Sequence, residues 1–298
     1  MTDTIYNSMD RRDFLKKSVA TIGAIAGSSA FGFDWFKDER EDTDWAFLAD
    51  THISQDTNDN NRGFYPYRNL QKAIPEITSY LPDGIVIAGD LARLEGNPGD
   101  YENLKQLLAP IPAKIPVYMA LGNHDNRLNF PQVFDKIHGE QQPVRNKLVI
   151  VVNRPLVRLI ILDSLLYVNQ VPGLLGKAQR QWLESYLKKC DNTPTILCFH
   201  HTLGDNDSDL LDTPGLFRII ESNRKIKAVV YGHSHMYRFD TFKGIHLINI
   251  PAMGYNFTDA EPVGWVRARL TSKGGDFILH AIAGNKQADG IVKKLTWR

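Results

Sequence analysis

Metal-binding side chains recur along this chain, each at or near the end of a short apolar run. The candidate ligands are Asp50, His52, Asp90, Asn123, His200, His233 and His235. Carboxylates and imidazoles together suit borderline divalent metals such as Zn, Mn, Fe or Ni. One ion takes about four to six ligands, so this set favours two ions that share a ligand and lie about 3.5–4 Å apart. We predict Asp90 as the shared ligand, because a carboxylate bridges two ions more readily than an imidazole does.

The charge of such a site favours an anionic phosphate group as the substrate. Two divalent ions outweigh the two aspartates even when a hydroxide lies between the ions, so positive charge remains. A hydroxide held in this way is a nucleophile near neutral pH.

The apolar runs that carry these residues are typical of fully buried strands, because they are continuous and rich in Val, Ile, Leu and Phe. With their polar ends they span 45–52, 84–90, 117–126, 195–201 and 228–235. Ligands of open α/β sheets bind beyond the carboxyl ends of the strands. We therefore expect the polar ends of the five runs to converge on one site.

The rest of the chain predicts an α/β fold. Helices are expected over 68–80, around 101–108 and over 176–189, where Trp182, Leu183, Tyr186 and Leu187 form a stripe expected in the core. Residues 147–164 are expected to form two adjacent strands. After Gly232, four strands follow without intervening helices, which predicts antiparallel pairing.

Composition sets limits on the class of protein. The chain has 298 residues, of which 43% are hydrophobic and 23% charged, which is typical of one large globular domain. The net charge of +1 gives no strong signal for nucleic acid or membrane. Two cysteines exclude a disulfide framework and a zinc site built on cysteine. A single Cys190–Cys198 bridge stays open if the protein is exported.

The N-terminal segment resembles a twin-arginine export signal. Arg11 and Arg12 precede Phe-Leu-Lys at 14–16 and a weakly apolar stretch, although Asp10 stands where Ser or Thr is usual. That stretch is too short and too rich in Gly and Ser to span a membrane stably. An amphipathic N-terminal helix is the alternative.

The resemblance implies that the twin-arginine export machinery is a partner and that the protein is periplasmic or extracellular. We expect a signal peptide over 1–30 with cleavage after Ala30, a charged linker over 31–44 and one catalytic domain over 45–298.

The order of the motifs resembles that of the calcineurin-like metallophosphoesterases. Asp-x-His, Gly-Asp, Gly-Asn-His-Asp, His-His and Gly-His-x-His follow one another between residues 44 and 283. The resemblance implies a four-layer αββα sandwich, in which two mixed β-sheets lie face to face between helices. It also implies two ligand sets joined by Asp90: Asp50, His52 and His235 for one ion, and Asn123, His200 and His233 for the other. The first histidine of the pair is the family's ligand, which favours His200 over His201.

Three further residues are candidates for catalysis. The resemblance implies that His124 donates a proton to the leaving oxygen of the ester, as general acid catalysis requires for a poor leaving group. Asp125 is expected to orient that ring or to cap the following turn. Arg93 either contacts a phosphate oxygen or forms a surface ion pair, and its place differs from the metal-binding tyrosine of purple acid phosphatases.

Together these features predict a hydrolase of small-molecule phosphoesters that attacks phosphorus directly. The motifs are most similar to the small bacterial phosphodiesterase branch, which favours a diester; a phosphomonoesterase is the alternative. A catalytically inactive scaffold is disfavoured because no ligand is missing. The loops at 54–67, 91–100 and 203–212 are expected to shape the pocket.

Overall fold

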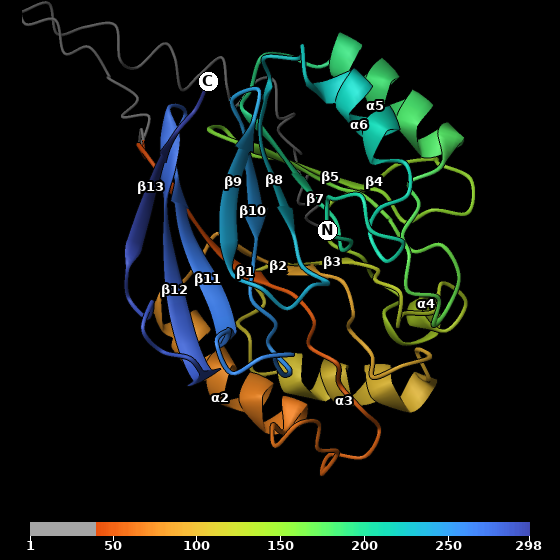
Figure 1. Ribbon diagram of the computed structural model, residues 1–298, viewed down its shortest axis with the longest axis vertical. Coiled ribbons are helices and arrows are strands. Elements are labelled where there is room, and N and C mark those ends of the chain that lie inside the picture. The colour runs from red at the N-terminus through yellow and green to blue at the C-terminus, as the bar shows by residue number, and fades with distance from the viewer. Residues whose placement is uncertain (1–39) are drawn as a thin grey trace, which may run out of the picture. The chain divides into compact units, whose positions relative to one another are not determined.

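The strands form two mixed β-sheets in the computed structural model, which describes residues 40–298 (Figure 1). The strand order of the first sheet is β13 (Val292–Thr296), β12 (Gly274–Gly284), β11 (Pro262–Leu270), β1 (Thr43–Leu48), β2 (Gly84–Ala88) and β3 (Val117–Ala120). The order of the second sheet is β4 (Glu140–Gln141), β5 (Ile150–Asn153), β6 (Arg158–Ile161), β7 (Thr195–Cys198), β8 (Ile226–Tyr231), β10 (Ile245–Asn249) and β9 (Arg238–Phe242).

Helices cover the outer face of each sheet (Figure 1). The first sheet is covered by α2 (Pro66–Ser79) and α3 (Pro98–Leu108), and the second by α5 (Lys177–Lys189) and α6 (Thr213–Ile220). The short helix α4 (Phe130–Val133) lies beside α3. This arrangement confirms the predicted αββα sandwich.

Alternating side chains of the second sheet separate the two layers of core. In β6, Leu159 and Ile161 belong to the cluster that both sheets share, while Ile160 belongs to the cluster beneath α5 and α6. A strand buried on both faces must be apolar at every position, which explains the continuous runs in the sequence.

Parallel pairing brings the polar strand ends to the same edge. β1, β2 and β3 are parallel neighbours in the first sheet, and β7 and β8 are parallel neighbours in the second. These are the five strands predicted to carry the site, and β5 and β6 are adjacent as expected.

The prediction of antiparallel strands after Gly232 was partly wrong. β9 pairs antiparallel with β10, and β11 pairs antiparallel with β12, but β10 also pairs parallel with β8. The chain then crosses to the other sheet, where β11 lies beside β1. Strand periodicity reports burial and not the identity of the neighbouring strand, so the crossover has no local signal.

Several smaller expectations change. Both α2 and α3 begin earlier than expected, with Pro66 and Pro98 in their first turns, where a missing N–H is harmless. In the α5 stripe only Leu183 and Leu187 are buried; Trp182 and Tyr186 stack on each other half-exposed, because they lie at the rim of the helix contact.

The possible disulfide bridge is absent. Cys198 is buried between the sheets in β7, whereas Cys190 follows α5 on the outer side of the second sheet, and both thiols are free.

The expected export signal lies outside the described residues, and β1 begins at Thr43, within the expected linker. Within 40–298, no helix has the length and apolar character needed to cross a membrane.

Candidate metal centre

The strand ends turn sharply to present the predicted ligands. Five of the seven have backbone φ angles in the left-handed region, between 46° and 73°: Asp50, His52, Asp90, His233 and His235. Residues other than glycine adopt this region at an energetic disadvantage, and such strain clusters at functional sites. The backbone at the centre is therefore shaped by the position of these side chains and not by local preference.

Two glycines allow the strand ends to approach each other closely. A Cβ atom at Gly122 would collide with Oδ1 of Asp90, and one at Gly232 would collide with Oδ2 of Asp50. Both carboxylates lie against bare backbone, so any larger residue at these positions would displace a predicted ligand.

The first group of ligand atoms joins the end of β1 in the first sheet to the loop after β8 in the second. The Nε2 atoms of His52 and His235 are 3.2 Å apart, and Nε2 of His235 is 3.3 Å from Oδ1 of Asp50. Atoms that share an ion at about 2.1 Å lie about 3 Å from one another. The spacing of this group therefore fits one ion.

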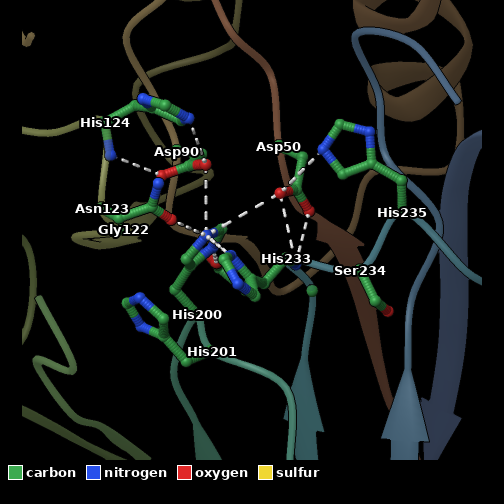
Figure 2. A network of polar contacts seen from close by, with 12 residues as sticks. Asp50, Asp90, Gly122, Asn123, His124, His200, His201, His233, Ser234 and His235 are labelled. Atoms are coloured by element: carbon green, nitrogen blue, oxygen red, sulfur yellow. Dashed lines mark hydrogen bonds and ion pairs between the residues drawn. The ribbon is translucent and has the colours of Figure 1, made fainter. Parts of the chain in front are cut away.

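The second group surrounds the Nε2 atom of His200 (Figure 2). This atom lies 3.2 Å from each of three others: Oδ2 of Asp90, Oδ1 of Asn123 and Nδ1 of His233. Asp90 also lies 3.8 Å from Nε2 of His52, which belongs to the first group. Its position between the groups is that expected of a shared ligand, and all seven predicted ligands are brought together.

Backbone carbonyls orient two of the rings. Nδ1 of His200 is 2.9 Å from the carbonyl of Ala88, and Nε2 of His233 is 3.0 Å from the carbonyl of Ser208. A carbonyl only accepts, so these two nitrogens carry the protons. The remaining ring nitrogens then face each other with lone pairs 3.2 Å apart, an arrangement that needs a cation or an added proton between them.

The charges around the centre favour a cation. Burial acts to lower the pKa of His200, but the carboxylates of Asp90 and Asp50 outweigh it and raise that pKa to about 9. Burial acts to raise the pKa of Asp50 and of Asp90, but the neighbouring histidines hold both below the ordinary value. Both carboxylates are therefore anionic, and the donor set fits two divalent ions.

His201 lies apart from the ligand groups. Its ring is buried and packs against His200 and His233, and its Nδ1 is 2.8 Å from the hydroxyl of Ser164. It belongs to none of the three ligand clusters found among residues 40–298, which agrees with the preference for His200.

His124 lies beside the shared carboxylate with one ring nitrogen free. Its Nδ1 is 3.0 Å from the carbonyl of Leu94, so that nitrogen carries a proton. Its backbone N–H donates to Asp90, and its Nε2 is 3.9 Å from Oδ2 of Asp90. His124 lines the cavity at the centre, where Nε2 is available to a bound ester.

Asp125 caps the turn and does not orient the His124 ring. Its buried carboxylate accepts hydrogen bonds from the backbone N–H groups of Leu91, Ala92 and Gly122 and from the hydroxyl of Tyr101. Burial and the nearby Asp90 raise its pKa to about 7. The expected orientation of the His124 ring is therefore wrong, and the turn that Asp125 caps is the one at 122–125 and not the following one.

Arg93 adopts the alternative expected for it, an ion pair. Its Nε lies 2.7 Å from the carboxylate of Asp59, and the residue is not among those that line the cavity. A direct contact with phosphate would require this pair to open.

The cavity at the centre has a volume of about 270 Å³. The sequence predicted only some of the residues that line it. Ser208 and Asp209 come from the expected loop at 203–212, but the loops at 54–67 and 91–100 contribute no lining residue. The unforeseen lining residues are Val171, Thr202, Ser234, Tyr255 and Phe257.

Tyr255 packs directly on the ligands, with its ring centroid 4.8 Å from those of His52 and of His235. Burial raises its pKa to about 12. It follows β10, whose carboxyl end lies at the site because β10 is parallel to β8. The sequence contained this strand end, but the expectation of antiparallel pairing placed it elsewhere.

Comparison with known proteins agrees with this centre. A family model for the calcineurin-like phosphoesterases matches residues 27–237. The chain is 26% identical to a probable cyclic nucleotide phosphodiesterase of Vesicomyosocius okutanii over 224 residues, which cover 73% of this chain and 89% of the relative. It is 30% identical to a 3′,5′-cyclic-nucleotide phosphodiesterase of Nostoc sp. over 196 residues, 64% of this chain and 68% of the relative.

The fold is shared with a solved dimetal phosphatase from Danio rerio, with a TM-score of 0.68 and 13% identity over 86% of this chain and 99% of that one. The matched family model covers more than half of the chain and includes all seven predicted ligands. The chain therefore belongs to the calcineurin-like phosphoesterase family.

Proposed function

We propose that this protein is an exported phosphodiesterase that uses two divalent ions. Asp50, His52 and His235 would hold one ion, and Asn123, His200 and His233 the other, with Asp90 shared. The observation that carries the proposal is the pair of inward lone pairs on His200 and His233, each ring fixed by a carbonyl and flanked by anionic carboxylates. Such an arrangement requires a cation or an added proton between the two nitrogens, and the remaining ligands around it favour a metal ion.

The protein's own residues account for the rest of the reaction. When bound, the two ions would supply positive charge for the phosphoryl oxygens and an activated hydroxide for attack on phosphorus. The carboxylate of Asp90 accepts a hydrogen bond from the backbone N–H of His124, and the Leu94 carbonyl accepts one from Nδ1 of the His124 ring. Nε2 of His124 is thereby held at the cavity, where the doubly protonated ring can donate the Nε2 proton to the leaving oxygen and keep the proton on Nδ1.

A diester is favoured over a monoester as the substrate. The two relatives are named as phosphodiesterases of cyclic nucleotides. The cavity joins the ligand groups to the exposed apolar side chains of Val171 and Phe257, which could contact a second ester group. A phosphomonoesterase remains the enzyme alternative, and the complete ligand set argues against an inactive scaffold.

The test is a hydrolysis screen of the purified protein over nucleotide, glycerol and aryl phosphoesters, with metal analysis of the same sample. We expect about two ions per chain and turnover of at least one diester. The Asp90→Asn variant should lose activity and metal together, because the shared ligand supplies charge as well as geometry. Wild-type metal content and activity in this variant would contradict the two-ion assignment.

Export is the second part of the proposal and rests on the sequence of the N-terminal segment. The twin-arginine route carries folded proteins, which suits an enzyme that acquires its metals before it leaves the cytoplasm. This part is tested independently of the chemistry.

A further inference from the structure

Phe257 stands out among the residues that line the cavity, because a large aromatic side chain is left 49% exposed beside a polar centre. Its ring stacks on His235 with a centroid distance of 4.1 Å and an angle of 14° between the planes. One face of the ring therefore covers a predicted metal ligand. The ring also lines the same cavity as the ligand groups.

The loop that carries Phe257 is fixed at both ends. The N–H of Gly254 donates to the carbonyl of Asp50, and the side chain of Asn69 donates to the carbonyl of Gly254. On the other side, the buried Asn256 donates to the carbonyl of Glu261. A ring held in this way loses little conformational freedom when a ligand packs on it, so the contact is preorganised.

A second apolar side chain lines the same cavity. Val171 is half-exposed, on a loop that is tied to the centre because the N–H of Asn169 donates to the carbonyl of Asn123. The N–H of Gly173 donates to the carbonyl of Asp209, which fixes the far side of this loop. The cavity thus combines the ligand groups with two positioned apolar side chains.

We propose that Phe257 is a specificity-determining residue that stacks on a planar heteroaromatic ring in the ester group, so that the preferred diesters are those of nucleosides. The inference rests on the proposed phosphodiesterase activity and deepens it. A glycerol or choline ester has no planar ring to place on Phe257, whereas every nucleobase has a π-face that stacks on an aromatic side chain. The base would lie against Phe257 while the phosphate occupies the centre.

The experiment compares two ligands that differ only in the base. They are the phosphonate analogues of AMP and of ribose 5-phosphate, in which a CH₂ group replaces the ester oxygen so that neither can be hydrolysed. Titration calorimetry on the Mn²⁺-loaded protein should give an affinity about thirtyfold higher for the adenosine analogue, the middle of the range for one stacked base. Phe257→Ala should remove this preference, so that the two analogues bind equally well, and metal analysis of the variant controls for the lost contact with His235.

Three further variants separate stacking from other effects. Phe257→Trp should keep the preference, and Phe257→Leu, which stays apolar without a π-face, should lose most of it. Ile291→Ala removes an exposed apolar side chain that does not line the cavity and should change neither affinity. Retention of the preference in Phe257→Leu would contradict stacking, and equal affinities in the wild type, or no binding of either analogue, would contradict the proposal as a whole.

The hydrolysis screen keeps the two proposals distinguishable. A protein that shows the base preference but cleaves no diester would contradict the phosphodiesterase and leave the role of Phe257 standing. Cleavage of diesters without a base preference would contradict the role of Phe257 and leave the phosphodiesterase activity standing.

Discussion

At the scale of single residues, hydrogen bonds to the backbone decide which atom of each histidine is available. The Leu94 carbonyl holds Nδ1 of His124, as the Ala88 carbonyl holds Nδ1 of His200. The difference lies in the surroundings of the other nitrogen. Nε2 of His200 is enclosed by three ligand atoms, whereas Nε2 of His124 is 3.9 Å from Asp90 in a side chain that is 18% exposed. The two rings therefore suit different roles.

We predict that His124→Ala keeps its metals but slows diesters with alkoxide leaving groups by about 10²–10⁴, the usual effect of a general acid. Esters of p-nitrophenol should be slowed much less, because that leaving group is stable as an anion. His200→Ala should lose metal and slow both classes alike. Rates on one alkyl and one nitrophenyl diester, with metal analysis, provide the test. Equal slowing of both esters by His124→Ala would indicate that His124 binds phosphate charge.

At the scale of elements, the site depends on how closely neighbouring strand ends approach each other. The Gly122 backbone after β3 touches the carboxylate of Asp90 after β2 and approaches the ring of His200 after β7. Three strands from two sheets thus meet at one glycine. Their spacing is set by the sheets, which cannot easily move apart to admit a larger side chain.

We predict that Gly122→Ala lowers metal affinity by about 10- to 100-fold, as expected when the support of a ligand is disturbed. The added Cβ must displace Asp90 or His200. The matched control is Gly290→Ala, where φ is +71° and a Cβ would meet nothing within 4 Å. The control should lower the free energy of unfolding by about 1 kcal/mol through backbone strain alone. Metal titrations and urea unfolding of both variants distinguish the effects, and unchanged metal binding in Gly122→Ala would contradict the prediction.

At the scale of the whole molecule, buried charge makes stability depend on pH. The ammonium group of Lys147, near the start of β5, donates to the carbonyls of Leu165 and Leu174 and lies 3.7 Å from Asp163. Burial lowers its pKa from 10.5 to about 8, although Asp163 acts in the opposite sense. Between these values the unfolded chain binds more protons than the folded one, so the free energy of unfolding rises with pH across this window.

We predict that this contribution, at most about 3 kcal/mol, is lost as the pH falls from about 10.5 to about 8. Lys147→Met removes the titration. The stability of the wild type relative to this variant should therefore increase as the pH rises through the window. Urea unfolding at several pH values measures the difference, with the exposed Lys72→Met as a control for the general loss of a charge. A difference that does not vary with pH would contradict the prediction.

Location in the cell also belongs to the whole molecule, and we predict that it depends on the paired arginines. Changing Arg11 and Arg12 both to Lys should retain the protein in the cytoplasm, because the export machinery requires the pair. Cell fractionation with an activity assay measures the outcome. Arrival of the variant in the cell envelope would show that the segment has another role.

The sequence by itself determined the class of fold and a set of candidate metal ligands that the fold brings together. Both depend on local features: continuous apolar runs for doubly buried strands, and polar residues directly at their ends. Asp50, His52 and Asn123 could be found in this way because each lies within a few residues of a strand that the pattern already marks.

Only the tertiary structure decided the rest of the site. The pairing of β10 with β8, and the crossover that follows, bring Tyr255 and Phe257 to the cavity. The same holds for Val171 and for the turn that Asp125 caps. These placements depend on which strands become neighbours and on contacts between residues far apart in the chain. Hydrophobic periodicity records how buried a strand is but not which strand lies beside it, so these contacts become visible only in the folded molecule.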